Sequence, residues 1–96
     1  MVSLSDILVH RQEILRIAAR HGARHVRLFG SVVRGQQTGQ SDVDLLVSMD
    51  NDRSLVDQVA IIQDMQDLLG VRVDVVPEDA LDQEVRDQVL KEAVAL

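Results

Sequence analysis

The sequence predicts an α/β fold of the α+β kind, in which a small mixed β-sheet carries helices mainly on one face. Two observations predict it. Amphipathic helical segments and short apolar strands follow one another in the order α-β-β-α-β-α, and the strand candidates alternate between apolar and polar side chains. The chain has 96 residues, which is enough for one hydrophobic core, so we expect residues 1–96 to form a single domain.

The N-terminal third predicts a helix followed by a strand. Apolar residues recur at helical spacing over residues 4–20, Ser5 is a candidate N-cap, and Gly22 can end the helix. Residues 25–29 alternate between apolar and polar side chains, as a half-buried strand does. A turn or a single helical turn is expected over residues 31–35, before the polar loop "QQTGQ".

The remainder of the chain predicts two strands and two helices. Ser54 followed by Asp57 is typical of a capping box, so a helix should begin there. The only proline of the chain closes the last strand candidate. The expected elements are a strand over residues 43–48, a helix ending at Gly70, a strand over residues 71–76 and a final helix capped by Asp79.

Composition excludes several classes of function. The chain has no cysteine, hence no disulfide or thiolate chemistry. A net charge of −6 and a single aromatic residue, Phe29, argue against direct binding of nucleic acid. No apolar run approaches the ~18 residues of a membrane span, so we expect a cytoplasmic protein with no membrane partner. Residues 1–34 nevertheless hold six arginines, which suits a small polyanion carried with a metal.

Two aspartates interrupt the apolar strand over residues 43–48. Because side chains alternate along a strand, Asp42 and Asp44 share one face while Val43, Leu45 and Val47 share the other. The apolar set should face the helices, which leaves both carboxylates on the open face with Cα atoms about 6.6–7 Å apart. Two carboxylates at this spacing can converge on a hard divalent cation such as Mg²⁺.

The last strand repeats the pattern. In "VRVDVV" (residues 71–76) the alternating valines share the core face, and Asp74 therefore lies on the open face. Three carboxylates on neighbouring strands could hold two Mg²⁺ ions ~3.5–4 Å apart, as in two-metal phosphoryl chemistry. Taken singly, Asp42 could instead cap its loop together with Ser41, and Asp74 could pair with Arg72 or end a strand.

A Gly-Ser turn precedes the aspartates. Gly30 lets the backbone approach a ligand closely, Ser31 offers an N–H group and a hydroxyl, and Arg34 adds a planar donor fork that suits phosphate. Gly-Ser alone is equally typical of an ordinary strand-to-helix turn with a serine cap. The sequence contains neither a Walker A motif nor Gly-x-Gly-x-x-Gly, which excludes the P-loop and Rossmann patterns.

Three segments together resemble the signature of the polymerase-β-like nucleotidyltransferase superfamily: Gly30-Ser31, Arg34-Gly35 and Ser41-Asp42-Val43-Asp44-Leu45-Leu46-Val47. The length and the third aspartate resemble its smallest branch, the minimal nucleotidyltransferase (MNT) antitoxins encoded beside HEPN-domain ribonuclease toxins. The resemblance extends from residue 26 to about residue 77. It implies the nucleotidyltransferase fold.

The resemblance also implies a reaction, in which AMP moves from ATP to a hydroxyl and pyrophosphate leaves. The implied acceptor is a tyrosine of a cognate HEPN toxin, with which the chain would form a hetero-oligomer. The roles it implies are metal binding and catalysis for Asp42, Asp44 and Asp74, and nucleotide binding for Gly30, Ser31 and Arg34. Two Mg²⁺ ions would be the cofactor, and Asp74 could help deprotonate the acceptor hydroxyl.

Two other functions stay open at this point. The chain could neutralise a toxin by binding alone, with a vestigial metal site. It could also be a nucleotidyltransferase with a small-molecule acceptor, although a chain of this length has little material for a separate acceptor-binding wall.

Overall fold

The computed structural model describes residues 2–36 and 42–96. Its elements are α1 (Leu4–Leu8), α2 (Arg11–Arg20), β1 (Ala23–Phe29), α3 (Ser31–Arg34), β2 (Val43–Met49), α4 (Leu55–Leu69), β3 (Val73–Pro77), the 3₁₀ turn η1 (Glu78–Ala80), α5 (Gln83–Glu92) and β4 (Val94–Ala95).

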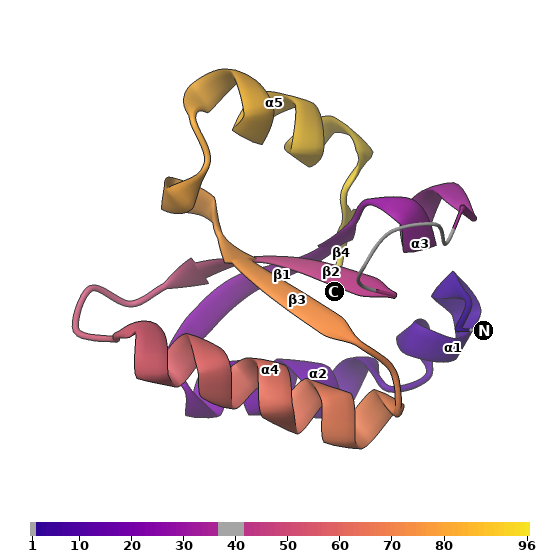
Figure 1. Cartoon of the computed structure of the whole chain (residues 1–96), viewed down its shortest axis with the longest axis horizontal. Coiled ribbons are helices and arrows are strands. Elements are labelled where there is room, and N and C mark those ends of the chain that lie inside the picture. Colours follow the sequence, from indigo (N-terminus) through magenta and orange to yellow (C-terminus); the bar gives the residue numbers. More distant parts are fainter. Residues whose placement is uncertain (1, 37–41) are drawn as a thin grey trace.

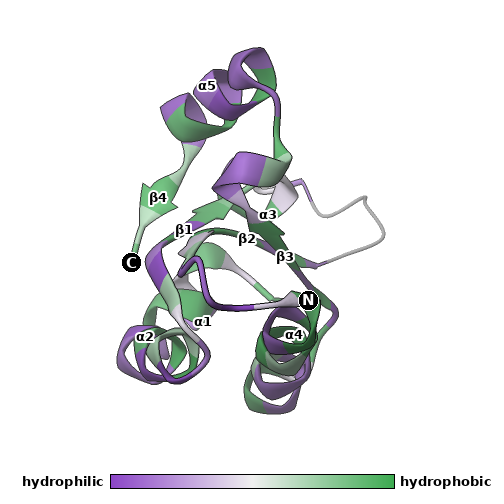
Figure 2. Ribbon diagram, turned by 90° about the vertical axis from the view of Figure 1, so that its left-hand side faces the viewer, coloured by the Kyte–Doolittle hydropathy of each residue, from purple (hydrophilic) through white to green (hydrophobic). Residues whose placement is uncertain are grey.

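The four strands form one mixed sheet in the order β3-β2-β1-β4. β1 is antiparallel to both β2 and β4, whereas β2 and β3 are parallel. Helices α1, α2 and α4 lie on one side of the sheet, and α5 lies on the other side (Figures 1 and 2). The expected fold class, a small mixed sheet with most of its helices on one face, is confirmed. Helix α5 and the short helix α3 lie on the opposite face (Figure 2).

The main core lies between the sheet and helices α2 and α4. From β2, the alternating side chains of Val43, Leu45 and Val47 are completely buried in it. This is the face that the alternation along the strand predicts to be apolar. The helices contribute fully buried residues at helical spacing: Ile14 and Ala18 from α2, Ile61 and Met65 from α4. Packing on this side therefore fixes which face of β2 and β3 carries the carboxylates.

The N-terminal helix differs from the prediction. The single helix expected over residues 4–20 is two helices, because the chain turns at Val9 and His10. The His10 N–H donates to the Ile7 carbonyl at 2.9 Å, which tightens the end of α1. Ser3 rather than Ser5 is the N-cap, in a capping box with Asp6. The apolar spacing continues through the turn, so periodicity could not reveal the change of direction.

The later elements are mostly as predicted. Ser54 and Asp57 form the expected capping box of α4, and Gly70 ends this helix in the left-handed conformation with φ of +69°. The predicted cap of the last helix was wrong. Asp79 lies in η1, and the side chain of Asp82 instead accepts a 3.0 Å hydrogen bond from the Val85 N–H. Among the described residues, no helix is long and apolar enough to span a membrane.

The short strand β4 was not predicted. Arg27 pairs with Ala95 and Leu28 with Val94, so the C-terminal segment extends the sheet beyond β1. The Leu96 N–H donates to the Val26 carbonyl at 2.9 Å, and the Leu96 side chain joins the core. This pairing places the end of α5 near the end of β1.

Candidate active site

The sheet register brings two of the predicted carboxylates side by side. In the β2–β3 ladder Asp44 is the direct partner of Asp74, and in the β1–β2 ladder it is the partner of Phe29. Neighbouring strands lie about 4.7–4.9 Å apart, and direct partners project from the same face of a sheet. Asp44 is half-buried and Asp74 is exposed. The expected meeting of these two aspartates is thus a property of the backbone.

Asp42 lies on the same face, just before β2, but its carboxylate is directed to Arg72. The Asp42 N–H donates to the Arg72 carbonyl at 3.0 Å, and the Asp42 carboxylate accepts from the Arg72 N–H at 3.3 Å. Arg72 Nε lies 3.7 Å from the same Oδ2 atom. The sequence alternative paired Arg72 with Asp74, whereas the structure pairs it with Asp42. The other alternative, a loop cap with Ser41, falls outside the described residues.

The donor set fits Mg²⁺ in kind, since carboxylate oxygens are the ligands that this ion prefers. Among residues 2–36 and 42–96, no three acidic, histidine or cysteine side chains are gathered as a ready metal cluster. Asp44 and Asp74 are aligned, and Asp42 would join them by rotating away from Arg72. The Arg72 side chain is 65% exposed, and such surface ion pairs contribute only about 0–1 kcal/mol. The rotation would therefore give up little from the ion pair, and it would also break the 3.3 Å hydrogen bond from the Arg72 N–H.

The predicted Gly-Ser turn lies directly against the Asp44 carboxylate. A Cβ atom on Gly30 would lie 2.6 Å from Asp44 Oδ2, closer than van der Waals contact allows. Gly30 also has φ of +78° and ψ of −149°, a conformation that is essentially restricted to glycine. Gly30 occupies the N-cap position, and Ser31 is the first, buried residue of α3. The alternative of a serine cap is therefore wrong.

Arg34, the predicted phosphate-binding arginine, ends α3 and forms an ion pair. Its Nη1 atom lies 2.8 Å from Oε1 of Glu92, the last residue of α5. Sequence reasoning missed Glu92, because nothing in its local pattern shows that β4 returns to β1. The two side chains are 49% and 36% exposed, so a ligand can reach the pair.

A third acidic contact anchors the segment that follows β3. The Glu78 carboxylate accepts a hydrogen bond from the Ser48 hydroxyl, and Arg27 Nη1 lies 3.2 Å from it. The hydrogen bond from Ser48, supported by the Arg27 charge, lowers the pKa of Glu78 from its ordinary value of 4.5. Arg27, which by strand alternation shares a face of β1 with Phe29, thus forms an ion pair with Glu78.

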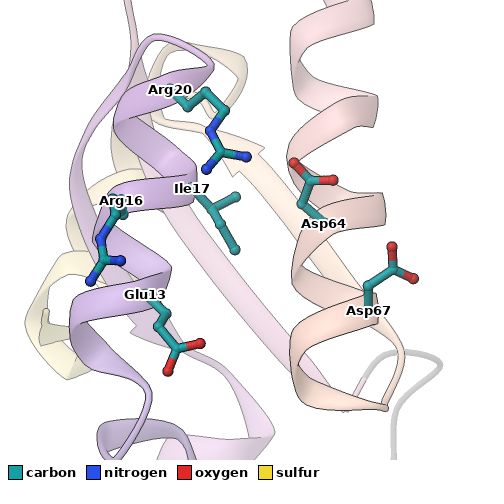
Figure 3. Close-up of a pocket in the computed structure, with 6 residues that line it drawn as sticks. All are labelled: Glu13, Arg16, Ile17, Arg20, Asp64 and Asp67. Carbon is teal, nitrogen blue, oxygen red and sulfur yellow. The ribbon is translucent and has the colours of Figure 1, made fainter.

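A separate charged groove lies on the opposite side of the sheet, between α2 and α4 (Figure 3). Its volume is about 310 Å³, and it is lined by Glu13, Arg16, Ile17, Arg20, Asp64 and Asp67. Side chains of opposite charge face one another across it. Arg16 and Arg20 belong to the arginine-rich N-terminal third. They lie in this groove and not beside Asp42, Asp44 and Asp74. Of the six arginines in residues 1–34, Arg34 is the one beside the Gly-Ser turn.

Comparison with known proteins gives a consistent result. The family model described as "Nucleotidyltransferase domain" matches residues 11–96. The protein adenylyltransferase MntA of Thermococcus cleftensis is 36% identical over 90 residues, which span 94% of this chain and 88% of the relative. A solved structure named "putative minimal nucleotidyltransferase" is 44% identical, with a TM-score of 0.86 over 99% of this chain and 97% of that chain. A crystal structure of a toxin–antitoxin with AMP-PNP shares the fold, with a TM-score of 0.71 and 21% identity over 88% of this chain and 69% of that chain.

Proposed function

The chain belongs to the nucleotidyltransferase domain family, and from this premise we propose that it is a metal-dependent protein adenylyltransferase acting as an antitoxin. In this proposal it transfers AMP from ATP to a tyrosine hydroxyl of a cognate HEPN ribonuclease toxin and thereby neutralises the toxin. The observation that carries the proposal is the register of Asp44 with Asp74 against the Gly30 turn. A pair of neighbouring carboxylates, of which Asp44 lies against the Gly30 turn, suits nucleotide chemistry better than a purely structural role.

The turn at Gly30 and Ser31 provides the place for the β- and γ-phosphates. The absence of a side chain at Gly30 lets the Asp44 carboxylate lie against the turn, and Arg34 is within one helical turn. Bound Mg²⁺, held by Asp42, Asp44 and Asp74, would neutralise the triphosphate charge and polarise the α-phosphoryl group. With the phosphates fixed in this way, the acceptor hydroxyl can approach the α-phosphorus in line with the leaving pyrophosphate.

Asp74 is the proposed proton acceptor. It is the most exposed of the three aspartates and lies at the β3 edge of the sheet, where an acceptor from another molecule can reach it. In the transfer, a bond forms between the acceptor oxygen and the α-phosphorus, and the bond between the α-phosphorus and the bridging oxygen breaks. The hydroxyl proton goes to Asp74, and pyrophosphate leaves beside Arg34.

Two features support a protein partner. The sequence has no tyrosine or tryptophan to stack on adenine, so a second protein would complete the nucleotide pocket. On α4, Leu55 and Val56 are 71% and 76% exposed, and exposed apolar groups of this kind are typical of protein interfaces. The relative named protein adenylyltransferase and the structural neighbour that is a toxin–antitoxin support a toxin as this partner.

The proposal is tested by intact mass spectrometry of a HEPN protein co-expressed with this chain. After incubation with ATP and Mg²⁺, the HEPN protein should gain one or more AMP units, and peptide mapping should place them on a tyrosine. Chelation of Mg²⁺ with EDTA should prevent the gain. A stable complex that gains no mass with any of the four nucleoside triphosphates would instead support neutralisation by binding alone.

A further inference from the structure

The carboxylate of Glu92 lies beside α3, the helix that follows the Gly30 turn. In this antiparallel pair Arg27 faces Ala95 and Leu28 faces Val94. Ala93, which links Glu92 to β4, is also extended, with φ of −67° and ψ of 146°. The pairing of Leu28 with Val94 therefore brings Glu92, the last residue of α5, near the end of β1.

Two further contacts hold this C-terminal segment in place. The Leu96 N–H donates to the Val26 carbonyl, and Arg11 Nη2 donates to the Leu96 carbonyl at 2.7 Å. Both contacts are made by Leu96 and hold the C-terminal end of β4, and on the other side of β4 the carboxylate of Glu92 lies beside α3. There its Oε1 atom lies 2.8 Å from Arg34 Nη1.

We propose that Glu92 is a positioning residue that competes with the nucleotide's phosphates for Arg34. This inference rests on the proposed function, since it assumes that Arg34 contacts the triphosphate. A carboxylate and a phosphate oxygen are alternative acceptors for the same guanidinium fork. In the free protein the carboxylate holds the fork, and nucleotide binding must displace it while bringing negative charge close to Glu92. Glu92 therefore lowers the affinity of the free protein for nucleoside triphosphates.

The expected size of the effect follows from exposure. Both side chains of the pair are more than a third exposed, and exposed ion pairs contribute about 0.2–1 kcal/mol. Converted at 1.36 kcal/mol per tenfold, removal of the Glu92 charge should tighten nucleotide binding by about 1.4- to 5-fold. Since salt screens exposed charges, the gain should shrink as ionic strength rises.

The test is calorimetric titration of the full chain with AMP-PNP and Mg²⁺, without a partner. Five proteins are compared: the natural chain, Glu92→Gln, Glu84→Gln, Arg34→Ala and the double variant Glu92→Gln/Arg34→Ala. Glu84 lies in the first turn of α5, so Glu84→Gln removes the same charge from the same helix about 12 Å away. We expect tighter binding for Glu92→Gln, no change for Glu84→Gln, and no added effect of Glu92→Gln once Arg34 is absent.

The outcomes separate this inference from the proposed function. If the natural chain binds AMP-PNP but Glu92→Gln behaves like Glu84→Gln, or binds more weakly, the role of Glu92 is overturned and the proposed function stands. An equal gain from Glu92→Gln with and without Arg34 also overturns it, because the carboxylate then acts by general repulsion. If neither the natural chain nor any variant binds AMP-PNP, and none does in the presence of the HEPN protein, both proposals fail.

Discussion

Two acidic regions lie on opposite sides of the same sheet and are built differently. On the open face, Asp42, Asp44 and Asp74 come from neighbouring strands, and the ladder makes Asp44 and Asp74 direct partners. In the groove between α2 and α4, Glu13, Arg16 and Arg20 come from α2, and Asp64 and Asp67 come from α4. There Asp64 Oδ2 also lies 2.8 Å from His21 Nε2.

The two regions differ in what lies opposite their acids. Asp64 and Asp67 face a helix that carries Arg16 and Arg20, and Asp64 also contacts His21, so cationic side chains of the chain itself lie close to them. Asp44 and Asp74 have backbone positions fixed side by side by the β2–β3 ladder. Carboxylates placed in this way suit a divalent cation, which is why we propose the sheet face for the chemistry and a structural role for the groove.

The largest effect is expected from single substitutions that compare the two regions. Asp74→Asn removes a charge from the sheet face, and Asp67→Asn makes the same change in the groove. We expect Asp74→Asn to slow adenylyl transfer by at least about a thousandfold, because in the proposed function Asp74 is both a metal ligand and the proton acceptor. Asp67→Asn should leave the rate unchanged. The rate of pyrophosphate release in the presence of the proposed HEPN partner measures both, and equal rates would contradict the assignment of the chemistry to the sheet face.

The next effect concerns stability. Leu45 lies beside Asp44 in β2 but points into the core, where it is fully buried. Leu45→Ala should reduce the free energy of unfolding by about 3 kcal/mol, from lost burial and the cavity left behind. Urea unfolding measures this loss. The rate of adenylyl transfer per folded molecule should be unchanged. A loss of transfer rate alongside the loss of stability would show that the core face of β2 also affects the carboxylate face.

A smaller effect is expected at the turn that touches Asp44. Gly30→Ala should lower the free energy of unfolding by about 2 kcal/mol, because it combines backbone strain with a Cβ atom 2.6 Å from Asp44 Oδ2. Gly70→Ala is the comparison, since Gly70 lies in the left-handed region, with φ of +69° and ψ of 19°, and has nothing within 4 Å of the added Cβ. Strain in that region should cost it about 1 kcal/mol. Thermal unfolding of both variants measures the added cost of the contact and of the glycine-only conformation at Gly30, and equal losses would refute it.

The smallest effect concerns pH. Glu78 follows β3 directly and forms an ion pair with Arg27. Because its pKa is lowered in the folded protein, the charged form adds stability above its ordinary pKa of 4.5. This stability is lost as pH falls below 4.5 and through the lower folded value. Glu78→Gln should therefore show a shallower loss of unfolding free energy than the natural chain between about pH 5 and pH 3. Urea midpoints across this range provide the measurement, and parallel curves would contradict the assignment.

Features encoded locally were predictable from the sequence. The alternation in β2 and β3 predicted that the carboxylates lie on the face away from the main core. Ser54 and Asp57 predicted the capping box of α4. Features created by tertiary pairing were not. Strand β4 has two residues and no periodicity of its own, so neither its pairing with β1 nor the contact of Glu92 with Arg34 could be anticipated. The Asp42–Arg72 pair likewise depends on how β2 and β3 align.

The most direct test of the central claim is intact mass analysis of the HEPN partner with ATP and Mg²⁺ and three versions of this chain. These are the natural chain, the Asp42→Asn/Asp44→Asn double variant of the sheet face and the Asp64→Asn/Asp67→Asn double variant of the groove. We predict AMP addition with the natural chain and with the groove variant, and none with the sheet-face variant. AMP addition by the sheet-face variant at the natural rate would contradict the assignment of catalysis to the aspartates of the open face.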